Sequence, residues 1–193
     1  MLSNAVCAMP ITAISNNIQM IVSQPPIWYL DRDNDGYYLN GSALTQCNSP
    51  GGFYKIVIIA GGDCNDTNVL INPGVAEICY NNIDDNCNGF VDEGCTISLN
   101  LKLFLEGMYL GGDSMLSSDT IKVDLRYAFS PYNIAWTSKD IIQQNGLGIF
   151  LFPAAVFNNN YYIVIQHRNA IETWTKFPVL FNSAVISYDF SRY

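Results

Sequence analysis

The sequence predicts a mainly β protein in three parts: an extended N-terminal arm over residues 1–27, a disulfide-rich and loop-rich segment over residues 28–95, and an immunoglobulin-like β-sandwich over residues 96–193. Three observations predict this class. Apolar and polar residues alternate along much of the last hundred residues, as they do in half-buried strands. Acidic residues and cysteines are concentrated in the middle part. No segment shows the 3.6-residue apolar period of a helix.

The arm is unusual because the first thirty residues contain no Asp, Glu, Lys or Arg. Ile18, Met20 and Val22 alternate with more polar neighbours, which predicts a strand, and Pro25-Pro26 follows it. Such a strand is suited to insertion into the sheet of a neighbouring molecule, as in donor-strand complementation. Repeated head to tail, this contact predicts self-association into a filament. The alternative is that the arm packs back on its own sandwich.

The middle part carries the whole net charge of the chain. Residues 31–95 hold ten acids and two bases, whereas residues 96–193 hold seven of each, and the net charge of the chain is -8. This acidic balance argues against nucleic-acid binding, which needs a basic face, and against attachment to anionic lipid. No apolar run approaches the roughly 18 residues of a transmembrane helix, so we expect no membrane span.

The six cysteines predict disulfides. None of them forms a C-x-x-C pair, and the chain has a single histidine, His167. A zinc site would need closely spaced Cys and His residues. Disulfides place the protein in an oxidising setting, outside the cell or on its surface. Of the fifteen possible pairings, we predict Cys47–Cys64, Cys79–Cys87 and Cys7–Cys95.

Two short loops in the middle part have the composition of calcium sites. The first has aspartates at alternate positions followed by Gly36, as in positions 1, 3, 5 and 6 of an EF-hand loop. The acid expected at position 12 is replaced by Ser42, so another carboxylate must complete the oxygen shell. The predicted ligands are Asp31, Asp33, Asp35, the carbonyl of Tyr37, and Asp63 or Asp66.

The second loop repeats the pattern with less charge, and Gly89 occupies its position 6. We therefore expect weaker binding there, and one or two Ca²⁺ ions in total. The alternative is that both loops are solvated Asx turns. The ligands predicted for the second loop are Asp84, Asn86, Asn88, the carbonyl of Phe90, Asp92 and Glu93.

Residues 28–95 resemble the MopE-type metal-binding motif of secreted and surface-associated bacterial proteins. The family name refers to copper, but copper prefers imidazole and soft ligands, and this segment has no histidine. We therefore predict calcium. The resemblance is carried by WYLDRDNDGY (28–37), Cys47, GDCNDT (62–67), NPGVAEIC (72–79) and NIDDNCNGFVDEG (82–94).

The last hundred residues predict about seven short strands, which is typical of an immunoglobulin-like sandwich. The clearest alternation runs over 97–105 and 121–127. Residues 99–107 and 161–174 are similar to a β-sandwich module common near the C-termini of large secreted bacterial surface proteins, which implies extracellular placement and nothing catalytic. Further β-rich runs cover 132–138, 148–157, 160–167, 171–175 and 177–190.

No set of residues predicts catalysis. His167, Arg168, Glu172 and Asp189 could form a polar cluster, but no G-x-S-x-G nucleophile elbow accompanies them. We expect instead an Arg168–Glu172 ion pair beside Trp174, with Trp174 filling the core.

Taken together, these features predict a non-enzymatic extracellular structural protein: a calcium-stabilised subunit of a surface assembly or filament. The alternative is a secreted adhesin or carbohydrate-binding module that makes glycan contacts through exposed aromatic rings. Tyr54, Tyr161 and Tyr162 are the candidates for such contacts.

Overall fold

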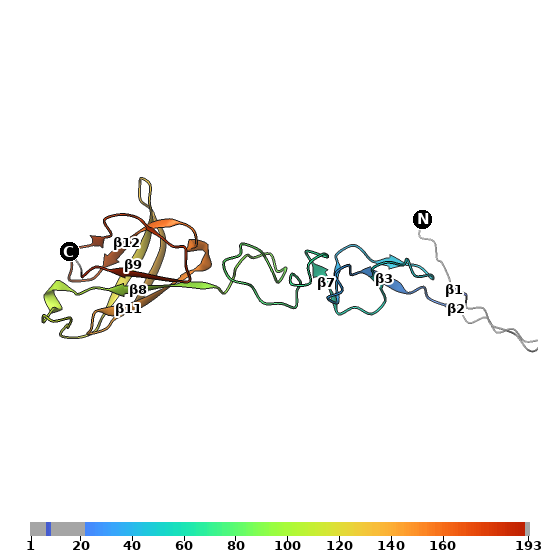
Figure 1. Ribbon diagram of the computed structural model, residues 1–193, viewed down its shortest axis with the longest axis horizontal. Helices are drawn as coiled ribbons and strands as arrows, with labels where there is room; N and C mark the ends of the chain where they lie inside the picture. The colour runs from blue at the N-terminus through green and yellow to red at the C-terminus, as the bar shows by residue number, and fades with distance from the viewer. Residues whose placement is uncertain (1–6, 9–21, 192–193) are drawn as a thin grey trace, which may run out of the picture. The chain divides into compact units, whose positions relative to one another are not determined.

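The computed structural model describes residues 7–8 and 22–191, which belong to two compact units (Figure 1). The first unit comprises the chain up to Ile78 together with Ile83–Val91, and the second comprises Cys79–Asn82 and the chain from Asp92 onward. Almost all regular structure is strand: within the described residues the helical elements are two short 3₁₀ turns, η1 (Glu106–Met108) and η2 (Ala154–Val156). The mainly β class is therefore confirmed.

The first unit is built from short strands and long loops. The predicted arm strand at Ile18 and Met20 lies outside the described residues. Three small sheets form: β1 pairs with β2, β3 lies between β5 and β6, and β4 runs parallel to β7. These strands are β1 (Cys7–Ala8), β2 (Val22–Ser23), β3 (Ile27–Leu30), β4 (Tyr37–Leu39), β5 (Leu44–Thr45), β6 (Tyr54–Lys55) and β7 (Ala60–Asp63).

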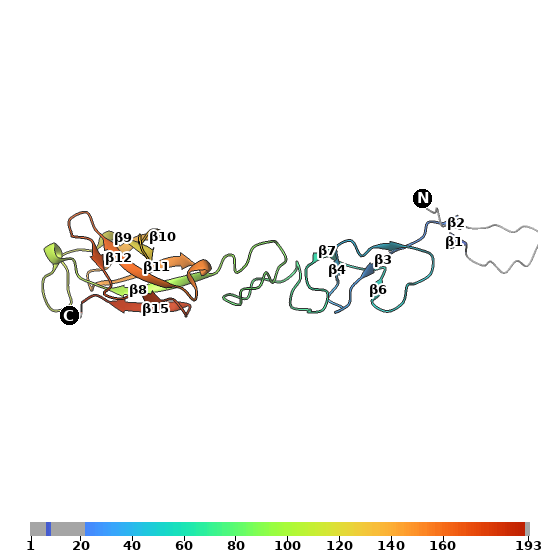
Figure 2. The ribbon, with the colours of Figure 1, turned by 90° about the horizontal axis from the view of Figure 1, so that it is seen from above.

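The second unit consists of two sheets (Figure 2). The larger sheet has the order β10-β9-β12-β13, with β14 also paired to β12, and all of its pairs are antiparallel. The smaller sheet has the order β11-β8-β15, in which β15 runs parallel to β8. The strands are β8 (Thr96–Lys102), β9 (Asp119–Tyr127), β10 (Ile134–Ile142), β11 (Leu147–Pro153), β12 (Asn160–Gln166), β13 (Thr173–Trp174), β14 (Val179–Leu180) and β15 (Val185–Asp189).

One hydrophobic cluster joins the two sheets. Alternate residues of β8, among them Leu99 and Leu101, are buried against alternate residues of β9 and β12 such as Val123 and Ile163, while Phe181 adds a fully buried ring. The alternation expected for 97–105 and 121–127 is thus found in the structure. In an immunoglobulin domain the first two strands share a sheet, whereas β8 and β9 lie in different sheets, so the immunoglobulin-like topology is not confirmed.

The disulfide pairing differs from the prediction. The structure joins Cys64 to Cys87 and Cys79 to Cys95, with Cα–Cα distances of 5.6 Å in each pair. The predicted pairs Cys47–Cys64, Cys79–Cys87 and Cys7–Cys95 are therefore wrong. Pairing of sequence neighbours fails because the loop around Cys87 folds back against residue 64, which leaves Cys79 to bond Cys95.

Within the described residues no helix is long and apolar enough to cross a membrane.

The expected Arg168–Glu172 ion pair is also wrong, because Arg168 binds Asp119 on β9, with Nη2 2.8 Å from Oδ2. Glu172 instead accepts hydrogen bonds of 2.6 Å from Gln166 Nε2 and from Trp174 Nε1. Trp174 is 37% exposed rather than part of the core. Its position on β13 opposite Val164 places it on the face of the sheet that points away from the hydrophobic cluster.

The stability of the folded protein should depend on pH through the carboxyl group of Asp119. A hydrogen bond from the Thr120 amide, another from His167, and the nearby Arg168 guanidinium hold the pKa of this carboxyl below its usual range. A lowered folded-state pKa stabilises the protein above the unfolded-state pKa, and this contribution is lost as the pH falls through the folded-state pKa. Asp119→Asn should therefore lower the melting temperature at pH 7, and the difference should shrink below about pH 4. Thermal melts across pH test this, and a pH-independent difference contradicts it.

Candidate metal centre

The first acidic loop connects β3 to β4 and folds around the carboxylate of Asp31. Asp31 is completely buried, and its Oδ1 and Oδ2 accept hydrogen bonds from the amides of Asn34 (2.7 Å) and Gly36 (3.3 Å). Asn34 and Gly36 have φ of 70° and 96°, so the loop bends in the left-handed region that Gly and Asn tolerate best. A Cβ on Gly36 would also lie 2.7 Å from Ile59 Cδ1. The loop therefore requires glycine at its sixth position.

Four aspartates around this loop share one arrangement. In each, Oδ1 accepts a backbone N–H, from Asp35 to Asp33, from Tyr37 to Asp35, from Asn65 to Asp63 and from Arg32 to Asp66. In each, Oδ2 is buried and has no hydrogen-bond partner within the described part of the chain. The amides thus fix four carboxylates in place and leave one oxygen of each available to a ligand.

These carboxylates fall into two overlapping groups. Oxygens of Asp31, Asp33 and Asp66 lie within 4.8 Å of one another, as do oxygens of Asp33, Asp35 and Asp63. Asp35 precedes β4, whereas Asp63 is the last residue of β7, which runs parallel to β4 and pairs with it at Leu39. Asp63 and Asp66, offered by the sequence as alternatives, both lie beside the loop. Tyr37, whose carbonyl was also predicted as a ligand, is the second residue after Asp35 and the first residue of β4.

The close packing of these carboxylates changes the pKa of two of them. Burial, together with the neighbouring negative charge of Asp35, raises the pKa of Asp33 and of Asp63. Lys55, on β6, places Nζ 2.8 Å from Asp31 Oδ2 and also donates to Asn34 Oδ1. Lys55 is not among the site residues predicted from the sequence, although it is one of only two bases in the acidic segment. One ammonium group leaves most of this negative charge uncompensated.

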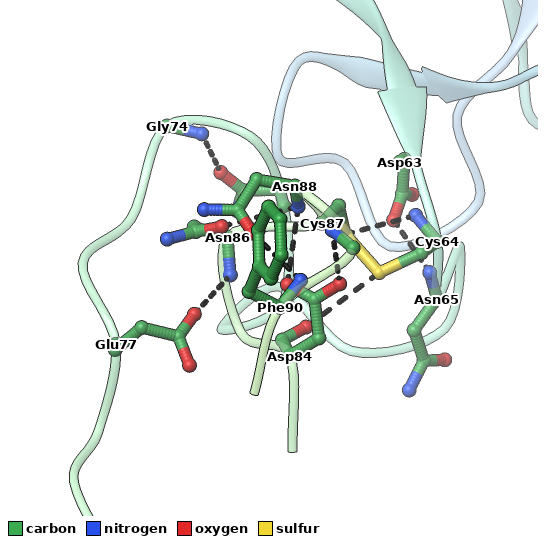
Figure 3. Close-up of a disulfide and its surroundings, with 12 residues drawn as sticks. Asp63, Cys64, Asn65, Gly74, Glu77, Asp84, Asn86, Cys87, Asn88 and Phe90 are labelled. Carbon is green, nitrogen blue, oxygen red and sulfur yellow. Dashed lines mark hydrogen bonds between the residues drawn. A yellow bond between two sulfur atoms is a disulfide. The ribbon is translucent and has the colours of Figure 1, made fainter. Parts of the chain in front are cut away.

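The second loop has the same hydrogen-bond skeleton (Figure 3). Asp84 Oδ2 accepts the Gly89 amide at 2.8 Å, as Asp31 accepts Gly36. Asn86 and Asn88 accept the amides two residues ahead, at 3.1 and 2.8 Å, as Asp33 and Asp35 do. Positions 4 and 6 of this loop, Cys87 and Gly89, again have positive φ, 56° and 92°. The two loops are therefore structural equivalents, and the second has fewer carboxylates at positions 1, 3 and 5.

Two of the residues predicted to close the second loop, Asp92 and Glu93, are assigned to the second unit. Asp92 belongs to the second unit, where it accepts hydrogen bonds from the amides of Tyr80 (2.7 Å) and Asn82 (3.3 Å), and Glu93 follows it in that unit. Glu77, which is not among the ligands predicted from the sequence, reaches the loop and accepts a hydrogen bond from the Asn86 amide at 3.0 Å. Its place in the run NPGVAEIC, which carries part of the resemblance to the MopE-type motif, was the available signal.

The Cys64–Cys87 disulfide joins the residue after Asp63 to the second loop (Figure 3). The carboxylate of Asp63 lies with those of Asp33 and Asp35, and Cys87 is position 4 of the second loop. The Cys64 amide also donates to Cys87 Sγ at 3.1 Å. A covalent bond therefore ties the positions of both sets of oxygens together within the first unit.

Comparison with known proteins identifies one family. A model described as "Putative metal-binding motif", of the copper-binding MopE type, matches residues 63–93. The match begins at Asp63 and spans the whole second loop and the Cys64–Cys87 disulfide. No curated protein and no solved structure matches the chain. The chain thus contains a segment similar to a MopE-type metal-binding motif, and the buried acidic groups beside it have the oxygen donors that a metal ion requires.

Proposed function

We propose that the first unit binds calcium and that the chain is a non-enzymatic, extracellular structural protein whose loops the ion holds rigid. The observation that carries this proposal is the set of four buried Oδ2 atoms without a hydrogen-bond partner in the described residues. A buried carboxylate oxygen without a partner lowers the stability of a protein considerably. A bound cation coordinated by these oxygens removes that penalty.

The donor set favours calcium over other metals. Calcium takes six to eight oxygen ligands in a flexible geometry, whereas magnesium requires a nearly ideal octahedron. Copper and zinc prefer imidazole or thiolate, but His167 lies in the second unit and the described cysteines are disulfide-bonded. Asp33 belongs to both acidic groups, so it would bridge ions bound in the two.

The second loop is proposed as a weaker site. Asn86 and Asn88 replace two carboxylates of the first loop by neutral amides, which reduces the attraction for a dication. Asp84 supplies the carboxylate at position 1 of this loop, and Glu77 lies at its edge. Occupation of both loops would reduce the excess negative charge that is concentrated in the first unit.

The extracellular role is supported by the disulfides and the motif, both of which are compatible with an oxidising environment outside the cell. The proposed assembly rests on the uncharged composition of residues 1–30, which suits donation of a strand to a neighbouring copy. A non-closing contact of this kind generates a filament.

Calcium titration of the full chain tests the proposal. Isothermal titration calorimetry should show one or two ions bound with dissociation constants of about 0.1–1 mM, the range of extracellular modules. Magnesium at the same concentration should bind more weakly. Absence of calcium binding at a calcium concentration of about 5 mM, which lies above the expected dissociation constants, would overturn the metal assignment. Tighter binding of copper than of calcium would overturn it as well.

Electron microscopy tests the assembly separately. In calcium, the full chain should form polymers, and deletion of residues 1–23 should abolish them while leaving calcium binding intact. A chain that stays monomeric at high concentration by sedimentation would remove the filament from the proposal without affecting the calcium site.

A further inference from the structure

The outer face of the larger sheet carries a polar row that the metal centre does not involve. Register places Lys139 opposite Lys122, and Lys122 opposite Gln166, so the three side chains share one face across β10, β9 and β12. The neighbouring inward residues Val123 and Ile165 belong to the hydrophobic cluster. The row therefore lies on the face that points away from the core.

The two lysines in this row repel each other. Like charges directly opposite on neighbouring strands destabilise a sheet. The charge of Lys122 is partly compensated, because its Nζ lies 3.1 Å from Asp124 Oδ2. Asp124 also accepts a hydrogen bond from Thr137. Lys139 is exposed and forms no ion pair within the part of the chain that the structure describes. An anion bound between the lysines would turn this repulsion into attraction.

The row opens into a hollow of about 570 Å³. Its walls include both lysines, Gln166, Arg168 and Asp119. The carboxylate of Asp119 is already engaged, since it binds Arg168 at 2.8 Å and His167 Nε2 at 3.3 Å. The Arg168 side chain remains 73% exposed despite this pair. The hollow thus presents three cationic side chains, and its own carboxylate is held by internal partners.

An aromatic ledge adjoins the hollow along β12. Tyr162 lies on the same face as Gln166, four residues away, which is roughly 13 Å along a strand. Its ring is 5.7 Å from that of Trp174 and 5.9 Å from that of Tyr132, and Arg126 lies 5.1 Å above Trp174. Tyr132 and Trp174 are 42% and 37% exposed. The negative faces of such rings attract the C–H groups of sugar rings, which carry partial positive charge.

We propose that this face binds an acidic polysaccharide, with uronate carboxylates in the hollow and sugar rings on the ledge. Three cations are enough for a chain that carries one carboxylate per sugar. They are too few for a nucleic acid, whose phosphates need an extended basic surface, whereas residues 96–193 hold seven acids and seven bases. The site uses residues of the second unit alone, so it goes beyond the calcium proposal and does not depend on it.

Affinity for polygalacturonate tests the proposal, and the same polymer with its carboxylates methyl-esterified is the matched ligand control. The full chain should bind the acid form and bind the ester at least tenfold more weakly. Lys139→Gln should weaken binding about threefold and the Lys122→Gln/Lys139→Gln pair about tenfold, as expected for exposed charge pairs. Trp174→Ala should weaken binding to the acid form as well. Lys176→Gln removes a charge outside the hollow and should have no effect.

Each titration is run in calcium and in EDTA, because uronates also bind calcium. Binding that persists in EDTA and is weakened by Lys139→Gln supports the site in the hollow. Binding that needs calcium and is unchanged by Lys139→Gln assigns the polymer to the metal centre and overturns the proposal. Equal affinity for the acid and the ester would indicate a neutral glycan site. Loss of self-association, but not of polymer binding, on Lys139→Gln would make the face an interface between copies. Either result, or no binding at all, contradicts the proposal.

Discussion

Asp63→Asn is expected to abolish the main part of the stabilisation by calcium and to leave the metal-free protein at least as stable as before. Without an ion, burial and neighbouring charge raise the pKa of Asp63, so its ionised form destabilises the folded state. An amide keeps the oxygen that accepts the Asn65 N–H and removes the charge. With calcium present, the same substitution deletes a ligand. The variant should therefore respond in opposite directions in EDTA and in calcium.

Thermal melts of the first unit measure both effects. At 1 mM calcium and a dissociation constant of about 0.1 mM, one site contributes about 1.4 kcal/mol, which raises the melting temperature of a unit of this size by roughly 6–11 °C. Asp63→Asn should lose most of that rise. The matched control is Asp140→Asn, an exposed aspartate on β10, which should keep it. A rise of the same size in Asp63→Asn would contradict the site.

Removal of the Cys64–Cys87 disulfide should have an equally large effect. The bond closes a sequence separation of 23 residues, and loss of such a crosslink lowers the free energy of unfolding by about 3 kcal/mol. Among the described residues of the first unit few apolar side chains are buried to offset this loss, because most of them, Val57 and Ile59 included, are exposed. The double variant Cys64→Ser/Cys87→Ser should also bind calcium more weakly, since the bond positions Asp63 relative to the second loop.

The Cys79–Cys95 disulfide provides the matched control. It closes a similar separation of 16 residues but lies in the second unit. Cys79→Ser/Cys95→Ser should therefore reduce stability by a comparable amount and leave the calcium affinity of the first acidic loop unchanged. Urea denaturation and calorimetric calcium titration of both double variants separate the two effects. Equal losses of calcium affinity in the two variants would show that the Cys64–Cys87 bond has no special link to the metal centre.

The alternating strands of the second unit could be predicted because their signal is local. In β8 every second residue is apolar, and burial of one face follows from that period alone. The two acidic loops could also be recognised, since the spacing of their side chains and glycines determines the hydrogen bonds within six residues. The paired N–H to Oδ bonds in both loops follow from this local spacing.

Features that depend on contacts distant in sequence could not be predicted in this way. Disulfide pairing depended on how the 84–89 loop folds back on residue 64, and no spacing rule encodes that path. The partner of Arg168 lies 49 residues away on β9. The predicted pair with Glu172, which is closer in sequence, was therefore wrong. Trp174 resembles a core residue by its size, but its register opposite Val164 places it on the outer face of the sheet.

The parallel pairing of β15 with β8 has a mechanical consequence. β8 is the first strand of the second unit after the Cys79–Cys95 bond and β15 is the last, and five residue pairs hold them side by side in the same direction. A force that pulls the start of β8 and the end of β15 apart acts along the strands, so it loads all of these hydrogen bonds in shear at the same time. Strands pulled from one end would instead release their bonds one after another. The second unit is therefore arranged to resist extension along its chain.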